Sequence, residues 1–296
     1  MKNIYLFLLL LLVSINCAQA KIVMEKKNGA INVKSATTQE VETLFNQYKY
    51  EDYTQTRSKF PRIYLSRLPV DWQDIETNDA KRRTFIRIMI PLILKVNEDI
   101  LRERAEIEEI NKKFKEGKKL NDKELNLLEE KAEKYNIFTR IKGDDRTQIL
   151  LRRLLKNVDA VPTSIMVSTA AIFTDWGTSR LANEANSFYL EEIWYEDKGL
   201  KPLHDKDANY RYRIFSSLEE CIAARALRLN SHVNFNYLRE IRELSRLQKR
   251  PPYGPQLVTQ MLKDNNFKNI SGLVDYTYTY YQLTKTDYFP ELEDVK

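Results

Sequence analysis

The sequence contains very little glycine, histidine and cysteine. Its 296 residues include seven glycines, two histidines (His204 and His232) and two cysteines (Cys17 and Cys221). It has neither a G-x-G-x-x-G nor a G-x-x-x-x-G-K-[ST] motif, which excludes the usual glycine-rich loops that bind nucleotide phosphates. The histidines and cysteines are too few for a Cys/His zinc site. We therefore expect no metal and no cofactor.

The first twenty residues have the layout of a secretory signal peptide. Lys2 supplies a positive start, residues 4–15 form an apolar run, and Ala18-Gln19-Ala20 is a small-residue cleavage site. The run is shorter than the roughly 20 residues that a transmembrane helix needs. We expect an exported, periplasmic or envelope-associated protein that is cleaved after Ala20 and has no stable transmembrane anchor. The alternative is a lipoprotein attached through Cys17.

The cysteine content bears on disulfide bonds, and the charge pattern bears on the kinds of partner that the chain could bind. Cleavage after Ala20 leaves Cys221 as a single cysteine, so we expect no internal disulfide and a fold held by packing. The chain has a net charge of +6, and its charges of both signs alternate, as in residues 95–119. Such a pattern is typical of solvated helix faces rather than of a nucleic-acid-binding patch. We expect no nucleic-acid partner, and the sequence does not indicate an oligomeric state.

Hydrophobic residues (43%) and charged residues (30%) with little glycine predict a globular, mainly α-helical chain. Residues 21–35 are polar and aperiodic, and predict a flexible lead-in. Two aromatic-rich stretches, 187–195 and 209–215, predict a β-hairpin. The tyrosine-rich stretch 274–285 fits a helix or a strand. Helices are expected over 37–50, 78–117 with a kink at Pro91, 121–135 with Leu125, Leu128, Ala132 and Tyr135 inward, 148–157, 162–176, 216–231 and 256–263.

The helix over 162–176 is almost wholly apolar and is expected to be buried. Pro162 fits its first turn, and Thr163 or Ser164 is expected to cap it. Two motifs lie at its ends: residues 158–164 read VDAVPTS, and residues 176–182 read WGTSRLA.

These motifs resemble V-D-x-x-P-T-S and A-A-x-E-S-x-W-G-x-S-x-L-A of the bacterial Bax-like exported proteins, which carry a peptidoglycan glucosaminidase domain of lysozyme-like fold. The likeness runs from Pro61 through most of the chain, including Phe215-Ser216-Ser217. It implies a mainly α, lysozyme-like helical domain with a small β-hairpin. The implied division is a signal peptide (1–20), a lead-in with one helix (21–60), a helical N-terminal region (61–149), the glucosaminidase-like domain (150–284) and a tail (285–296).

The family's chemistry depends on the glutamate of A-A-x-E-S, a general acid whose pKa is raised near the end of a buried helix. An ungapped count from Trp176 places Phe173 at this position, and phenylalanine has no proton to transfer. The resemblance therefore implies a degenerate family member. Asp175, Glu184 and Glu191 are the candidates for a displaced catalytic carboxylate.

Other family positions have also changed. The family's N-x-F-G reads SFYL over residues 187–190, with Leu190 in place of glycine, and Arg225 falls where a tyrosine is usual. Aromatic side chains are the candidates for stacking on a sugar. The glycan-contacting candidates are Phe173, Trp176, Phe188, Tyr189 and Tyr253.

Three functional hypotheses remain open at this point. The first is a non-catalytic protein that binds peptidoglycan or another N-acetylglucosamine-containing glycan, or that acts as a scaffold. The second is an active endo-β-N-acetylglucosaminidase that uses a displaced carboxylate such as Glu191 or Asp175. The third is a protein that keeps only the fold and has no sugar contact.

Overall fold

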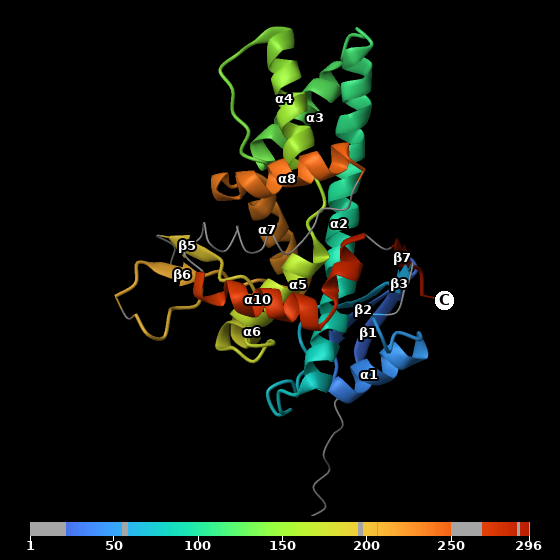
Figure 1. Cartoon of the computed structure of the whole chain (residues 1–296), viewed down its shortest axis with the longest axis vertical. Helices are drawn as coiled ribbons and strands as arrows, with labels where there is room; N and C mark the ends of the chain where they lie inside the picture. The colour runs from blue at the N-terminus through green and yellow to red at the C-terminus, as the bar shows by residue number, and fades with distance from the viewer. Residues whose placement is uncertain are drawn as a thin grey trace, which may run out of the picture.

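A computed structural model describes residues 22–54, 59–194, 198–205, 207–249, 268–288 and 291–295. The signal peptide, Tyr253 and the helix expected over 256–263 lie outside these residues. Figure 1 shows a mostly helical molecule arranged along one long helix, α2 (Asp79–Lys115). Helices α3 (Asp122–Lys134) and α4 (Gly143–Asn157) pack beside one end of α2, and the other elements gather around its remaining length.

The N-terminal segment forms a β-hairpin, so the prediction of a flexible lead-in is wrong from Val23 onward. Strands β1 (Val23–Lys27) and β2 (Ala30–Ser35) are antiparallel, and β2 also pairs in parallel with β4 (Ile63–Leu65). Asn28 and Gly29 at the turn have φ values of 51° and 71°. Two consecutive left-handed residues form the two-residue turn that suits a hairpin, and Asn-Gly is the preferred pair for it.

Helix α1 (Thr38–Gln47) confirms the amphipathic pattern seen in the sequence. Thr37 and Glu40 form a capping box, which satisfies two backbone amides at the start of the helix. Its apolar side chains face the core. The residues of α1 that are buried are Val41, Leu44 and Phe45.

Helix α2 begins after Asn78, whose side chain accepts a hydrogen bond from the Lys81 amide, and it continues through Pro91. Gly117, at φ 70°, follows its end as expected. Helix α3 begins with a second capping box, made by Asn121 and Glu124. Of its four expected inward residues, Leu128, Ala132 and Tyr135 are buried, whereas Leu125 is exposed.

Helix α5 (Thr163–Phe173) is the central buried helix, and every residue from Thr163 to Ala171 is buried. The expectation that Thr163 or Ser164 caps it is wrong, because Pro162 occupies the cap position and no side chain at the helix start makes the cap hydrogen bond. The acceptor comes instead from Asp287. The Ser164 amide and hydroxyl donate to its carboxylate at 2.8 and 2.5 Å.

The remaining chain confirms the expected hairpin and the helix after it, and shows that the tyrosine-rich stretch is helical. Strand β7 (Glu291–Glu293) pairs in parallel with β3 (Lys59–Pro61), which brings the end of the chain against the N-terminal part. From Arg180 onward the described helices and strands, besides β7, are α6 (Arg180–Ala185), β5 (Glu192–Trp194), β6 (Tyr210–Tyr212), α7 (Leu218–Ser231), η1 (Val233–Phe235), α8 (Asn236–Leu247), α10 (Lys268–Tyr280) and η2 (Leu283–Tyr288).

Buried apolar side chains form one cluster that extends from Ile31 to Val295. Residues on both sides of position 150 belong to this cluster. The domain boundary expected there stays a prediction. Among the described residues, no helix combines the length and the apolar character that crossing a membrane requires.

Candidate functional site

The turn after α5 explains the tryptophan-glycine pair of the second motif. Asp175, Trp176 and Gly177 all have positive φ values, of 47°, 59° and 81°, so the chain leaves the helix directly after its C-cap, Thr174. A Cβ atom on Gly177 would lie 2.4 Å from the Leu68 Cδ1 atom. Glycine suits this position both for its backbone conformation and for the limited space available.

Phe173, which the ungapped count aligned with the general acid of the Bax-like family, is the last residue of α5 and is half-buried. Its side chain packs against the apolar core. A carboxylate at this place would stand at the end of a buried helix, partly screened from water. Phe173 itself has no proton to transfer.

The other aromatic candidates in the described residues lie below the surface. Trp176 is buried against Phe85 and Tyr281, with ring centroids 5.8 and 5.1 Å apart. Phe188 is also buried and packs 6.1 Å from Phe85. The buried Tyr189 hydroxyl donates to the Met166 carbonyl at 3.2 Å. Of these four candidates, Phe173 alone is partly exposed.

The three candidate carboxylates have separate surroundings. Asp175 is exposed and accepts a hydrogen bond from the Thr178 hydroxyl at 3.2 Å. Glu184 is exposed on α6 and pairs with Arg180 at 3.0 Å. Glu191 is half-buried and pairs with Arg228 of α7 at 3.3 Å. Each of the three therefore has a polar or charged partner of its own.

Two positions that differ from the family's pattern, Leu190 and Arg225, lie near Glu191. Leu190, which stands where the family has glycine in the sequence comparison, has φ 54°, the left-handed conformation that glycine adopts without strain. The Arg225 guanidinium lies 5.7 Å from the Tyr189 ring and 5.3 Å from the Phe235 ring. Burial lowers the pKa of Arg225 to about 10, although the nearby Glu191 opposes the shift. Arg225 therefore places a buried positive charge here.

Cys221 is buried on α7 and its sulfur accepts a hydrogen bond from the Phe188 amide at 3.3 Å. Burial raises the pKa of this thiol to about 12, so it stays protonated and is a poor nucleophile. Within the described ranges, no group of three or more histidine, cysteine, aspartate or glutamate residues could hold a metal ion.

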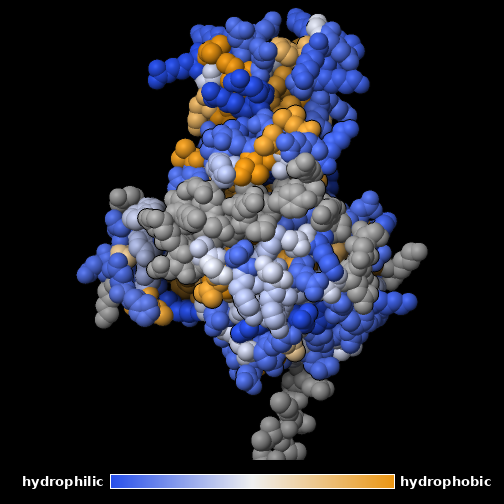
Figure 2. Space-filling view, viewed as in Figure 1, coloured by the Kyte–Doolittle hydropathy of each residue, from blue (hydrophilic) through white to orange (hydrophobic). Residues whose placement is uncertain are grey.

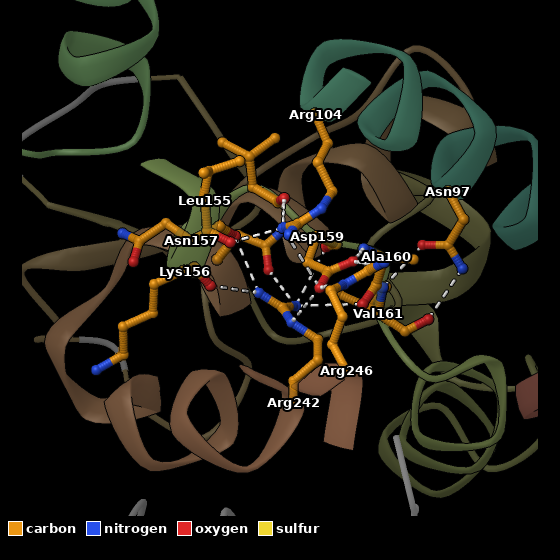
Figure 3. A network of polar contacts seen from close by, with 12 residues as sticks. Asn97, Arg104, Leu155, Lys156, Asn157, Asp159, Ala160, Val161, Arg242 and Arg246 are labelled. Carbon is orange, nitrogen blue, oxygen red and sulfur yellow. Dashed lines mark hydrogen bonds and ion pairs between the residues drawn. The ribbon is translucent and has the colours of Figure 1, made fainter. Parts of the chain in front are cut away.

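Asp159 of the first motif lies at the centre of a buried polar network (Figure 3). Arg246 donates to both carboxylate oxygens, from Nε at 2.8 Å, and Arg104 and Arg242 approach within 3.6 and 3.8 Å. Burial alone would raise the pKa of Asp159, but the Arg246 hydrogen bond and the charges of Arg242 and Arg104 hold it below its usual value.

The same arginines fix the loop between α4 and α5. Arg242 donates to the carbonyls of four loop or helix-end residues, at 2.9 to 3.3 Å, and to the Asn230 side chain at 2.6 Å. Asn97 of α2 both donates to and accepts from the Val161 backbone at 2.9 Å. The motif's aspartate therefore positions the start of α5, and the sequence alone gave no sign of its arginine partners. The four carbonyls belong to Lys156, Asn157, Asp159 and Ala160.

Comparisons with known proteins give one informative match. No family model and no solved structure matches the chain, so the lysozyme-like fold stays a prediction. Protein bax of Escherichia coli (strain K12) is 27% identical over 197 residues, which cover 65% of this chain and 64% of that protein. The match thus spans less than two thirds of the length of its relative. At this level, the chain is a distant homologue of Protein bax.

Proposed function

We propose that this chain is an exported, cell-wall-directed protein that binds peptidoglycan or another N-acetylglucosamine-containing glycan without cleaving it. The observation that carries the proposal is Phe173 at the end of the buried helix α5. The motifs on either side of that helix resemble those of the Bax-like glucosaminidase family, and the distant homology to Protein bax is in line with that resemblance.

The loss of hydrolysis follows from the chemistry of the reaction. Glycoside hydrolysis uses two carboxyl groups, one of which must be protonated to release the leaving oxygen. General acid catalysis of this kind contributes roughly 10²–10⁴-fold to the rate. Phe173 cannot supply the proton, and Asp175 and Glu184 are exposed surface acids.

The second candidate function is an active glucosaminidase that uses Glu191. This carboxylate is the one candidate acid among the three that is half-buried, and it lies against the positive charges of Arg225 and Arg228. In this candidate function Glu191 would act as the base or as a charge stabiliser. An acid opposite it would still be required.

A digestion assay on purified peptidoglycan tests both candidates. We expect no release of soluble fragments by the chain lacking residues 1–20, and measurable release by Phe173→Glu, because the variant restores an acid in its partly buried position. Phe173→Gln is the matched control, since glutamine has a similar shape but cannot transfer a proton. Fragment release by the native chain that disappears in Glu191→Gln would refute the proposal in favour of the active enzyme.

A further inference from the structure

A pocket lies between α2, α4 and α8, beside the network around Asp159. It has a volume of about 570 Å³, and its lining residues come from these three helices and from Asp159, just after α4. Pockets of about 300–1,000 Å³ typically bind small organic molecules. Phe173 and the three candidate carboxylates do not line it, so the pocket is distinct from the site at the end of α5.

Four large apolar side chains line the pocket, and three of them are leucines. Leu151 of α4 is buried, whereas Leu155 of α4 and Phe114 of α2 pack against the core but stay partly exposed. Leu247, at the end of α8, is 77% exposed. Figure 2 shows hydrophobic atoms, in orange, that remain exposed around α8. Because leucine offers no hydrogen bond and gains about 25 cal/mol per Å² of covered apolar area, these walls suit a hydrocarbon chain.

The charged side chains at the pocket carry a positive surplus. When the lining residues are taken together with their ion-pair partners, five are basic and three are acidic. The basic residues are Arg104, Lys115, Arg152, Arg242 and Arg246, and the acidic ones are Glu108, Asp159 and Glu243.

Two of the basic residues are free to bind a ligand. Lys115 of α2 and Arg152 of α4 are exposed, and in the described part of the chain neither forms an ion pair. Glu243 of α8 is the lining acid that likewise lacks an ion pair there. Two free positive charges against one negative charge complement a single anionic group.

The negative charge of Asp159 lies away from this pair of basic residues. Lys115 is eleven residues beyond Arg104 on α2, which corresponds to about 16 Å along the helix axis. Arg104 lies 3.6 Å from the Asp159 carboxylate, and Figure 3 shows Arg246 at the same carboxylate. An anionic group beside Lys115 therefore avoids repulsion by Asp159, while a chain attached to it can extend over the leucines.

We propose that this pocket binds a long-chain fatty acid, with its hydrocarbon chain on the leucines and its carboxylate beside Lys115 and Arg152. A phospholipid with two acyl chains is much larger, and a standard protein interface buries about 800 Å² on each partner, more than one pocket of this size provides. The inference goes beyond the proposed function, because it uses neither Phe173 nor a glycan.

Isothermal titration calorimetry with sodium laurate, below its micelle concentration, tests the ligand class on the chain lacking residues 1–20. We expect saturable binding of one laurate and no binding of acetate, which lacks the chain. Dodecyltrimethylammonium has the same chain but a positive head group, and should bind about tenfold more weakly. The absence of saturable laurate binding, or equal affinities for the two amphiphiles, would overturn the proposal.

A substitution in the apolar wall tests the location. Leu247→Ser should weaken laurate binding about tenfold, because it removes apolar area that the chain covers. Leu244→Ser is the matched control, since Leu244 is 53% exposed on the same helix but does not line the pocket. Equal affinities of the two variants would show that laurate binds elsewhere and would overturn the proposal.

The basic residues are tested by the double substitution Lys115→Gln with Arg152→Gln, which should also weaken laurate binding about tenfold. Arg140→Gln with Lys142→Gln changes the net charge equally at two exposed residues outside the pocket, and should leave binding unchanged. Circular dichroism and thermal unfolding verify that each variant keeps the fold. Equal effects of the two double substitutions would refute the assigned position of the carboxylate.

A last comparison separates a free fatty acid from a membrane surface. We expect no sedimentation of the chain with phosphatidylglycerol vesicles. Sedimentation with these vesicles without binding of free laurate would identify an anionic lipid surface as the ligand and would overturn the proposal.

Discussion

Replacing Asp159 by asparagine tests whether the arginine network holds the start of α5. Asparagine keeps the shape of the side chain but removes its charge. The side chains of Asp159 and Arg242 are 4% and 3% exposed, so the substitution removes the carboxylate that faces the buried Arg242 charge. Arg104, which is 9% exposed, would keep only its ion pair with Glu108. Breaking a buried ion pair by removing one partner costs about 3–5 kcal/mol. We expect a loss of that size in the free energy of unfolding.

Urea unfolding followed by circular dichroism at pH 7 measures this loss. With a slope of about 3 kcal/mol per molar urea or less, the midpoint should fall by about 1 M or more. Glu108→Gln is the control, since Glu108 pairs with the same Arg104 but is 51% exposed. Exposed ion pairs contribute about 1 kcal/mol or less, so this variant should unfold almost like the native chain.

The pH dependence gives an independent result for the same variant. The pKa of Asp159 is lower in the folded chain than its ordinary value of 3.8, so its ionised form stabilises the fold above about pH 4 and this stability is lost as the pH falls. The difference between native and Asp159→Asn should thus be full at pH 7 and shrink below pH 4. A variant within about 1 kcal/mol of native at pH 7, or a difference that persists at low pH, would refute the reasoning.

Two further predictions concern single sites. Gly177→Ala should lower the free energy of unfolding by about 2 kcal/mol or more, because its Cβ would meet the Leu68 side chain at 2.4 Å. Gly117→Ala, at φ 70° with nothing within 4 Å, should cost only the backbone strain of about 1 kcal/mol; equal losses in urea unfolding would contradict this. Burial raises the pKa of Asp287 to about 7, whereas the ordinary value is 3.8. Between these two pH values the folded carboxyl keeps a proton that the unfolded one has lost. The free energy of unfolding should therefore fall as the pH rises from about 4 to about 7. Asp287→Asn should abolish this fall, and a variant with an unchanged pH profile would show that another group causes it.

Local signals in the sequence predicted much of the helical fold. The spacing of Val41, Leu44 and Phe45 predicted α1. Asn78 and Asn121 marked the predicted starts of α2 and α3, and each is the N-cap of its helix. The hairpin of β1 and β2 also had a local signal, the Asn28-Gly29 pair, which the polar composition around it concealed. These features depend on neighbouring residues, so a single sequence contains the information.

Features that join distant parts of the chain could not be predicted in this way. The cap of α5 comes from Asp287, 123 residues beyond Ser164, and the partners of Asp159 on α8 lie more than 80 residues away. The tyrosine-rich segment fits both periodicities, and its contacts with α5 and α2 decide in favour of a helix. At the candidate site, the assignment of Phe173 from the motif count stays a prediction. The burial of Trp176, Phe188 and Tyr189 depends on the complete packing, which the motif does not contain.

The C-terminal contacts also affect when the chain can fold during its synthesis. Asp287 caps the central helix, β7 completes a sheet with β3, and the Val295 amide donates to the Gly29 carbonyl at 2.7 Å. A ribosome must therefore translate almost to residue 295 before the first strands and α5 have all their partners. Until then the nascent polypeptide remains incompletely folded, and its buried apolar side chains lack part of their packing.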